Sequence, residues 1–347
     1  MQKGGPPQRR SGKDSSPAAE GRGRTRAGSR APAPRAAGSA SKAQEVTIGG
    51  RRLSLTNLSK VLYPEAGFTK AEVIDYYSRI APVLLPHLKG RPLTMKRYPD
   101  GVDRFFFYEK NCPAHRPDWV KTLPVWSDGN ETTMHYCNLA DLPTLVWAAN
   151  LASLELHPSL SLGKALSQPT MVVFDLDPGA PAALLECCEV ALLLRDRLQA
   201  LGLRSFVKTS GSKGLQLYVP LNTKVVYEGE GRSVGTKDFA RAMAEVLERQ
   251  RPHLVVSNMK KSLRVGKVLV DWSQNDEHKT TVGVYSLRAK ERPTVSTPVA
   301  WEEVEQGLKK GDPALLRFEA ADVLARVEAH GDLFAEVLTL RQKLPSP

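Results

Sequence analysis

The segment Met171–Pro178, with the sequence MVVFDLDP, constrains the fold of this chain more than any other. An apolar run leads directly into two carboxylates that stand two positions apart. Because residues two apart on a β-strand point to the same face, Asp175 and Asp177 are expected to project together from the end of a buried strand, which Pro178 would terminate. Two neighbouring carboxylates repel each other and are costly to bury. The pair therefore predicts a cation site, with a solvated strand end as the alternative interpretation.

The composition is that of a globular, water-soluble chain. The 347 residues are 41% hydrophobic and 25% charged, enough for one large domain or two small ones. The sequence has neither an apolar run of membrane-spanning length nor a signal peptide, which predicts a cytoplasmic protein without a membrane partner. The cysteines form no CxxC pair, so we expect reduced, packed thiols rather than a zinc ribbon or a disulfide framework at Cys112, Cys137, Cys187 and Cys188.

Positive charge is concentrated at the N-terminus. The net charge is +12, and the first 50 residues contain ten Lys or Arg against three Asp or Glu. A segment this rich in Gly, Pro, Ser, Ala and Arg cannot bury enough apolar surface to fold. Residues 1–45 are therefore expected to form a disordered basic tail that binds polyanions or solubilises the chain. A main domain is expected over 46–312, with a helical extension of the same domain over 313–347.

Hydrophobic periodicity and capping residues predict the surrounding elements. Thr69 and Glu72 have the form of a capping box, which predicts a helix over 70–81 that ends at Pro82. From Met171 onward the pattern predicts a β-α-β-β unit, half of a mixed sheet with helices packed on it. Its strands are expected at 171–176, 205–209 and 215–219 and its helix at 181–200. Further helices are expected to begin at 141 and to span 236–250, and a pair of helices interrupted at Gly331 is expected from 320 onward. Further strands are expected at 93–98, 104–108, 132–137, 268–271 and 280–284.

The turn between the last two strands of that unit, residues 208–214, reads KTSGSKG. Its glycines allow successive backbone N–H groups to converge on an anion, and its serines and lysines add donors and charge, which suits a triphosphate. It is not a Walker A loop, and an ordinary surface turn is the alternative. A third carboxylate, Asp271, ends another apolar run, with Gln274 and Arg288 beyond it. Three carboxylates beside such a turn are suited to hold two divalent ions.

Taken together and in this order, the motifs resemble the polymerase domain of bacterial ligase D, which belongs to the archaeo-eukaryotic primase superfamily. The resemblance covers residues 50–312 and implies a mixed α+β fold. A primase-like catalytic core with an RRM-like sheet would carry an N-terminal α/β module packed against it. The segments that carry the resemblance are Asn57–Pro64, Arg91–Arg97, Glu155–Pro158, Phe174–Gly179, Lys208–Leu215, Val270–Asn275 and Tyr285–Arg288.

The resemblance implies a repair polymerase that adds ribo- or deoxyribonucleotides to a primer 3′-hydroxyl at short gaps or breaks in DNA. Asp175, Asp177 and Asp271 would be the catalytic carboxylates and would hold two ions of manganese or magnesium. The incoming nucleoside triphosphate would be contacted by polar residues of several segments, namely Lys96, His157, Ser210, Ser212, Lys213, Gly214, Gln216, Gln274 and Arg288.

Two further groups of residues are implied to contact gapped or broken DNA. Asn57, Lys60 and Lys70 would form a pocket for the 5′-phosphate of the downstream strand, supported by free N–H groups at the start of the predicted helix. Base stacking on aromatic rings is tolerant of sequence, as a repair polymerase requires. The residues implied to contact the template are Arg97, Phe107, Tyr108 and Lys110, with Phe105 and Phe106 expected in the core.

The match departs from the family pattern at two positions. Gln216 stands where the superfamily usually has histidine, and glutamine can donate a hydrogen bond but cannot carry a positive charge. Glu109 replaces a usual glutamine and adds negative charge near the expected DNA path. No KxDG ligase motif occurs in the sequence. The resemblance therefore implies a free-standing, monomeric polymerase, associated with the bacterial nucleoid. A separate ATP-dependent ligase would act with it, and Ku would be a further partner if the pathway is end joining.

Two other functions stay open on the sequence. The first is a non-catalytic DNA-end binding protein that keeps the fold and recruits repair factors; primer extension separates it from the polymerase. The second is a glycosyltransferase in which Asp175 and Asp177 hold a sugar-nucleotide diphosphate, which leaves Lys60 and Lys70 without a role. For a polymerase, end joining and base-excision gap filling are the alternative pathways.

Overall fold

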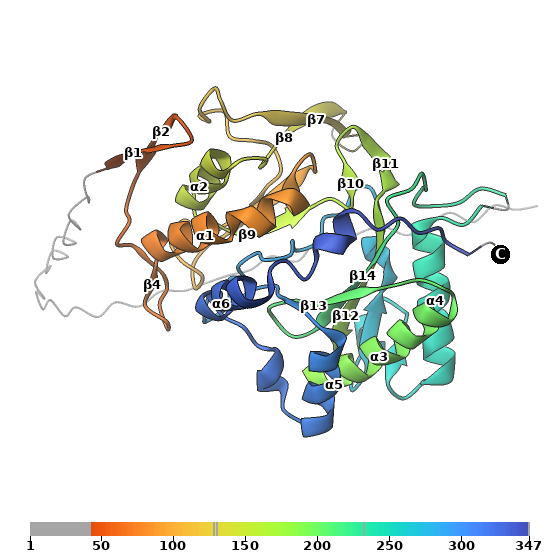
Figure 1. Cartoon of the computed structure of the whole chain (residues 1–347). Helices are drawn as coiled ribbons and strands as arrows, with labels where there is room; N and C mark the ends of the chain where they lie inside the picture. Colours follow the sequence, from red (N-terminus) through yellow and green to blue (C-terminus); the bar gives the residue numbers. More distant parts are fainter. Residues whose placement is uncertain (1–42, 128, 130, 232, 346–347) are drawn as a thin grey trace, which may run out of the picture. The chain divides into compact units, whose positions relative to one another are not determined.

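The computed structural model describes residues 43–127, 129, 131–231 and 233–345 (Figure 1). The tail predicted at 1–45 therefore lies almost entirely outside the described residues. The described part begins with a hairpin of strands β1 (Gln44–Ile48) and β2 (Arg51–Leu55). Within that part, no helix combines the length and apolar character needed to span a membrane.

The largest sheet has six strands in the order β15 (Val255–Val256), β16 (Val268–Asp271), β12 (Met171–Pro178), β14 (Leu215–Pro220), β13 (Phe206–Thr209) and β17 (Pro298–Val299). Every neighbouring pair is antiparallel except β15 and β16, which run parallel. The predicted β-α-β-β unit is confirmed, since helix α3 (Leu184–Ala200) follows β12 and leads to β13 and β14. The sheet is thus mixed, as expected.

Alternation along β12 separates an apolar face from a polar one. Val172, Phe174 and Leu176 share an apolar core with α3 and with helix α4 (Thr236–Gln250), and Figure 1 shows both helices beside the sheet. Because alternate residues point to opposite faces, Asp175 and Asp177 point away from these helices. A further helix, α5 (Trp301–Lys310), packs on α3. Asp175 and Asp177 are therefore placed by a strand whose other face is anchored in a core.

A second, smaller sheet lies in the N-terminal half. Its order is β6 (Phe107–Glu109), β5 (Leu93–Arg97) and β9 (Ser153–Pro158), all antiparallel. Helices α1 (Lys70–Leu88) and α2 (Leu142–Asn150) share its apolar core. The remaining strands form hairpins: β3 (Val61–Tyr63) with β4 (Phe68–Thr69), β7 (Thr122–Ser127) with β8 (Thr132–Cys137), and β10 (Ser161–Leu162) with β11 (Ala165–Pro169).

Helix α1 is longer than predicted. The capping box of Thr69 and Glu72 is present, but the helix continues through Pro82 and Pro86 to Leu88. The two prolines are four residues apart and both exposed, so their rings lie on the solvent side of the helix. Packing of the buried face, which includes Leu84, outweighs the lost helical hydrogen bonds. The prediction that Pro82 ends the helix was therefore wrong.

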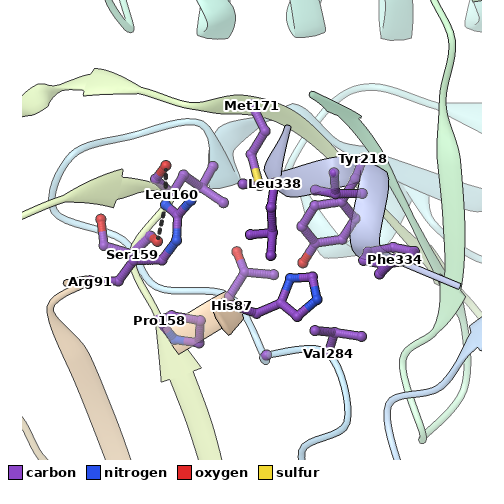
Figure 2. Close-up of a pocket in the computed structure, with 13 residues that line it drawn as sticks. His87, Arg91, Pro158, Ser159, Leu160, Met171, Tyr218, Val284, Phe334 and Leu338 are labelled. Atoms are coloured by element: carbon purple, nitrogen blue, oxygen red, sulfur yellow. Dashed lines mark hydrogen bonds between the residues drawn. The ribbon is translucent and has the colours of Figure 1, made fainter. Parts of the chain in front are cut away.

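The C-terminal segment differs from its prediction in two places. Helix α6 (Ala320–His330) ends at Gly331, as expected, but the second helix is only a 3₁₀ turn, Ala335–Leu338. The strand predicted at 280–284 is an irregular segment in which Thr280 forms a single bridge to Ser159. A cavity of about 40 Å³ lies beside this segment (Figure 2). It is too small for a nucleotide, because ligand pockets usually measure about 300 Å³ or more.

The cysteines follow their prediction only in part. Cys187 and Cys188 are free and buried in α3, as expected. Cys112 and Cys137, however, form a disulfide that ties the segment after β6 to the end of β8. The expectation of reduced thiols was wrong for this pair. The two residues are 25 positions apart, so no short spacing motif in the sequence indicates that they pair.

Candidate active site

Two of the predicted carboxylates, Asp175 and Asp271, lie in one row across the large sheet, and Asp177 stands two residues along on the same face. In the antiparallel register, Asp175 on β12 is paired with Asp271 on β16 and with Gln216 on β14. Residues directly opposite in such a register share a face, so the three side chains stand side by side. Burial, followed by the charge of Asp177, raises the pKa of Asp175. The pKa of Asp177 is also raised, by burial and then by Asp271, and the charge of Arg264 counteracts this increase.

This donor set fits divalent cations, although the described residues contain no group of three His, Cys, Asp or Glu side chains arranged around one point. Both oxygens of Asp271 are engaged by the next turn: Oδ1 accepts from Ser273, and Oδ2 accepts from the Gln274 amide at 3.1 Å. Asp175 and Asp177 repel each other, and a cation would relieve that repulsion. The chemistry of the set therefore matches hard cations with oxygen ligands.

The turn after Asp271 is fastened to the sheet by Asn275. Its side-chain amide donates to the carbonyl oxygen of Val173 at 2.7 Å, and its carbonyl oxygen accepts from the Val173 N–H at 2.9 Å. The side chain thus copies the pairing of a strand residue and holds the Asp271 turn against β12. The sequence drew attention to Asn275 only as a neighbour of Gln274.

Gln216 is buried and forms a hydrogen bond with Asp175. Lys208 Nζ donates to the Gln216 carbonyl oxygen at 2.5 Å and to Ser296 Oγ at 2.5 Å. Because the Gln216 carbonyl oxygen is engaged in this way, its NH₂ group is left to donate to Asp175, a hydrogen bond that opposes the rise in the Asp175 pKa. Gln216 therefore contacts Asp175 at the position where a direct contact with the nucleotide was expected.

The turn at 210–214 is built differently from the prediction. The N–H groups of Ser212 and Gly214 donate to Ser210 Oγ at 3.2 and 3.1 Å, so this hydroxyl takes the place that an anion was expected to fill. Gly214 is required by close approach, because a Cβ atom there would lie 1.9 Å from the carbonyl oxygen of Leu176. Ser212, Lys213 and Gly214 line a cavity of about 310 Å³ together with Lys290 and Arg317. An anion in this cavity would therefore meet cationic side chains and not a group of converging backbone N–H donors.

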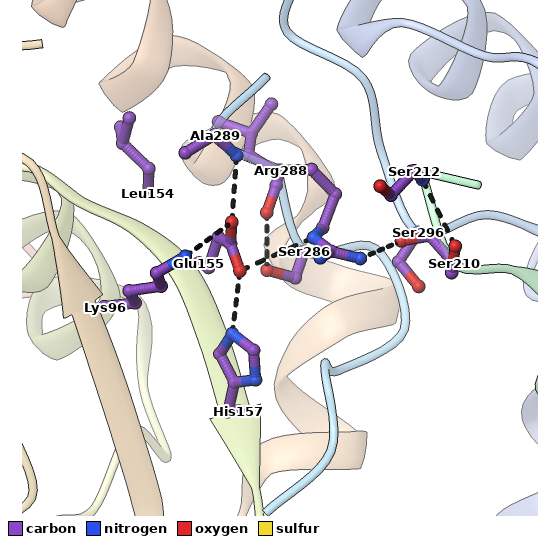
Figure 3. A network of polar contacts seen from close by, with 12 residues as sticks. Lys96, Leu154, Glu155, His157, Ser210, Ser212, Ser286, Arg288, Ala289 and Ser296 are labelled. Carbon is purple, nitrogen blue, oxygen red and sulfur yellow. Dashed lines mark hydrogen bonds and ion pairs between the residues drawn. The ribbon is translucent and has the colours of Figure 1, made fainter. Parts of the chain in front are cut away.

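The small sheet gathers the other predicted nucleotide contacts around one buried carboxylate, Glu155 (Figure 3). Glu155 Oε2 accepts from His157 Nε2 at 2.9 Å, and Oε1 lies 3.6 Å from Lys96 Nζ. Arg288 Nε is 3.4 Å from Oε2. Burial alone would raise the pKa of Glu155, but the hydrogen bond from His157 and the charge of Arg288 lower it to about 2. Glu155 is thus ionised, and it brings Lys96, His157 and Arg288 together.

Arg288 connects this cluster to the large sheet. Its Nη1 donates to the carbonyl oxygen of Ser210, and its positive charge lowers the pKa of Asp177 against the effect of burial. The carboxylate row and the Glu155 cluster therefore belong to one site, which is bounded by the 210–214 turn. A site with carboxylates on one side and Lys and Arg on the other suits a metal-bound polyphosphate.

The residues predicted to bind a 5′-phosphate are brought together at the start of α1. Lys70 Nζ donates to the Thr56 carbonyl oxygen at 2.7 Å, while Lys60 pairs with Asp100 at 2.5 Å. Burial, followed by the charges of Lys60 and Arg97, lowers the pKa of Lys70 to about 8. Asn57 has a left-handed backbone, with φ of 53°, in the same loop. The repulsion between the two lysines marks a place where an anion would be favoured.

The helix start itself does not contribute as predicted. The N–H groups of Lys70, Ala71 and Glu72 donate to Lys60 O, Leu58 O and Thr69 Oγ1, respectively. The first turn of α1 therefore has no free N–H group at these three positions. Binding of a phosphate there would rely on the side chains.

The predicted template contacts form an aromatic surface on and beside β6. Phe105 is 75% exposed and stacks on Phe107, with ring centroids 6.1 Å apart, and Tyr108 is also exposed. The expectation that Phe105 and Phe106 belong to the core was wrong, because both are exposed. The rings lie on both faces of the strand, since Phe107 is paired with Arg97 and Tyr108 with Lys96. Exposed rings suit base stacking.

Two charged residues beside these rings have different surroundings from those expected. Arg97 donates to Glu109 at 2.9 Å and to the Leu151 carbonyl oxygen at 3.0 Å, so it fastens β5 to its neighbours. The charge of Glu109 is therefore compensated by Arg97, whereas the sequence suggested that it faces DNA. Lys110 follows β6 and is exposed.

Sequence reasoning missed four residues of this site. Lys208 and Glu155 stood inside quoted motifs, but a buried charge can be recognised only from its tertiary partners. Lys290 carries its charge near Arg288, and burial and the Arg288 charge lower its pKa. Phe105 was missed because a run of aromatic residues gives no alternation to separate the two faces of a strand.

Comparisons with known proteins identify the family of this chain. Residues 69–334 match the family model described as LigD, primase-polymerase domain. A relative from Mycolicibacterium smegmatis, called multifunctional non-homologous end joining protein LigD, is 43% identical over 286 residues, which is 82% of this chain and 36% of that protein. The bifunctional end joining protein LigD of Bacillus subtilis is 32% identical over 280 residues, 81% of this chain and 43% of its own length.

A solved structure gives the same result. The polymerase domain of Mycobacterium tuberculosis ligase D in complex with DNA superposes with a TM-score of 0.75 and 40% identity, covering 84% of this chain and 99% of that domain. The mixed α+β, primase-like fold is thereby confirmed. The chain spans well under half the length of the curated relatives, so it matches one part of them. On these grounds the chain belongs to the LigD primase-polymerase domain family.

Proposed function

We propose that this protein extends a DNA primer by nucleotidyl transfer at short gaps or breaks, using ribo- or deoxyribonucleoside triphosphates. The observation that carries the proposal is the single site in which Asp175, Asp177 and Asp271 lie beside Lys213 and Arg288. A nucleoside triphosphate carries the negative charge that these cations require, and its metal ions carry the positive charge that the carboxylates require. Membership of the family supports the same reaction.

Each group of residues has a part in this reaction. Asp175, Asp177 and Asp271 would hold two ions of manganese or magnesium. When bound, such ions lower the pKa of the primer hydroxyl and neutralise charge on the pyrophosphate that leaves. Lys96, Lys213 and Arg288 would bind and orient the phosphate oxygens, with Ser210, Ser212, Gly214, Gln274 and His157 around them. Gln216 would keep Asp175 oriented.

The wild-type protein provides the first test. The protein is incubated with manganese, one nucleotide and a duplex with a short gap. It is expected to lengthen the primer by the number of consecutive template positions in the gap that pair with that nucleotide. A protein that only binds DNA ends would shift the duplex in a gel and leave the primer length unchanged. That result would replace the polymerase proposal with the binding one.

We infer that Asn57, Lys60 and Lys70 dock the 5′-phosphate at the far side of the gap. A phosphate would replace Asp100 as the partner of Lys60 and would offset the repulsion that lowers the pKa of Lys70. The rings of Phe105 and Phe107 would then stack on template bases from one face of the strand, and Tyr108 would do so from the other. The aromatic surface and the lysine pocket both belong to the N-terminal half, so this half would hold the DNA.

Lys60→Ala is expected to remove most of the advantage that a downstream 5′-phosphate gives to primer extension. The loss should be about tenfold, the equivalent of one charge-assisted hydrogen bond. Extension rates on gapped duplexes with and without the phosphate measure it. Lys89→Ala, which removes an exposed lysine at the other end of α1, is the control and should keep the full advantage. Equal behaviour of the two variants would contradict the docking site.

The pathway and the division of the chain are part of this proposal. The relatives are named non-homologous end joining proteins, which favours end joining over base-excision gap filling. Ku and an ATP-dependent ligase would then act at the same break. We assign the catalytic unit to residues 46–312, with 313–347 as its helical extension.

A further inference from the structure

We propose that Glu155 is a positioning residue that fixes Lys96, His157 and Arg288 relative to one another and thereby sets the affinity of the site for a nucleoside triphosphate. This inference rests on the proposed function. Glu155 itself is only 2% exposed, so it is placed to act through its neighbours. The three neighbours come from separate segments: β5, β9 and the loop after residue 284.

The register of the small sheet explains why these side chains meet. Lys96 on β5 is paired with Glu155 on β9 and with Tyr108 on β6, so all three share one face. His157 stands two residues beyond Glu155 and therefore points to the same face. The Ala289 N–H donates to Glu155 Oε1 at 3.1 Å, which holds the backbone beside Arg288. One carboxylate thus anchors both the side chain and the backbone of the arginine segment.

Lys96 is confined from two sides. Its ammonium lies 4.4 Å from the ring centroid of Phe106 and 5.2 and 5.5 Å from those of Tyr98 and Tyr108. Aromatic faces attract a cation but do not fix its position along the strand. Glu155 Oε1, 3.6 Å from the ammonium nitrogen, adds an ion pair that draws the cation toward the cluster. Without it, Lys96 would keep its charge and lose its fixed position.

The net charge of the cluster favours binding of an anion. Lys96 and Arg288 are cations, and among the described residues Glu155 is the carboxylate that pairs with both. Burial lowers the pKa of His157, which favours its neutral ring. The cluster therefore keeps a surplus positive charge after the internal pairs are made. A bound triphosphate would meet cations that are already oriented, and this reduces the cost of ordering them on binding.

Two opposite effects of Glu155 can be told apart by experiment. If Glu155 mattered only through its negative charge, Glu155→Gln would bind a triphosphate more tightly. If it positions the cations, the same variant should bind about tenfold more weakly, because an amide cannot accept from His157 and approach both cations at once. Titration with a fluorescent ribonucleoside triphosphate in manganese measures the dissociation constant, and primer extension gives KM and kcat. We expect KM to rise about tenfold and kcat to change by less than that.

Glu303→Gln is the matched control, because Glu303 also forms a close pair with an arginine, Arg326, at 2.7 and 2.8 Å, but outside the site. It should lower the melting temperature and leave the dissociation constant unchanged. An unchanged or lower dissociation constant in Glu155→Gln would overturn the positioning role. If this variant does not fold, Glu155→Asp, which keeps the charge and loses reach, should show the same weakening. Failure of both variants to fold would assign Glu155 to stability alone.

The titration also separates this proposal from the proposed function. A wild-type protein that binds the triphosphate but extends no primer would refute the polymerase, and the comparison of dissociation constants would still test Glu155. A wild-type protein that extends primers while Glu155→Gln keeps its KM would refute the positioning role alone.

Discussion

Asparagine in place of Asp175 is expected to abolish nucleotide addition and, at the same time, to raise the melting temperature of the metal-free protein. Asparagine keeps the shape of the side chain but removes a charge that repels Asp177 and Asp271. Loss of a metal-binding carboxylate should lower kcat by about 10³-fold or more, since such ligands contribute several kcal/mol to the barrier. Relief of about 1 kcal/mol of repulsion should raise the melting temperature by roughly 2 to 4 °C.

The gain in stability should depend on pH in a defined direction. Burial and the Asp177 charge raise the pKa of Asp175 in the folded protein from 3.8 to about 7. A carboxyl group with a raised folded pKa costs stability when it is ionised. The difference in melting temperature between Asp175→Asn and the wild type should therefore have its full size above pH 7. It should shrink as the pH falls below the folded pKa of Asp175 and vanish near pH 4. Thermal denaturation in the presence of a chelator at a series of pH values measures it.

Asp332→Asn supplies the contrasting control. Asp332 accepts from His87 at 2.8 Å and from Tyr285 at 2.7 Å, and these hydrogen bonds lower its pKa although burial opposes them. Its replacement should lower the melting temperature at neutral pH and leave primer extension in place. Asp175→Asn should still bind gapped DNA with the wild-type affinity. Residual extension by Asp175→Asn above about one thousandth of the wild-type rate would contradict the assignment of the metal site.

Local patterns in the sequence predicted the features of this site that depend on alternation and capping. The apolar and acidic residues of β12 alternate as the strand requires, and Thr69 and Glu72 cap α1. Both signals lie within a few residues and need no knowledge of the partner elements. The strand at 268–271 and the helix at 236–250 were predicted with the bounds that the structure has, for the same reason.

Features that depend on distant partners could not be predicted in this way. The carboxylate of Glu155 pairs with the side chains of Lys96 on β5 and of Arg288, more than 50 and 130 positions away in the sequence. The pairing of Lys208 with Ser296 and the disulfide of Cys112 likewise arise only when the sheets are assembled. Even the 210–214 turn, a local feature, was predicted with the wrong donors, because Ser210 satisfies the N–H groups that seemed available to an anion. Residue types therefore indicated the chemistry of the site, and tertiary pairing decided which atoms are available for it.

Arg288→Lys is expected to reduce kcat/KM for the nucleotide by about 100-fold, although the positive charge is kept. The guanidinium extends Nε toward Glu155 and Nη1 to the Ser210 carbonyl oxygen, and so joins the small sheet to the turn of the large sheet. A lysine ammonium is a single point charge and can reach only one of these partners. Arg326→Lys is the matched control: it breaks the two-pronged contact with Glu303, so it should lower the melting temperature and leave kcat/KM unchanged. Steady-state primer extension with varied nucleotide measures both variants. If Arg288→Lys kept kcat/KM within about twofold of the wild type, a point charge would suffice at this position, and the planar fork that joins the two sheets would have no part in binding the triphosphate.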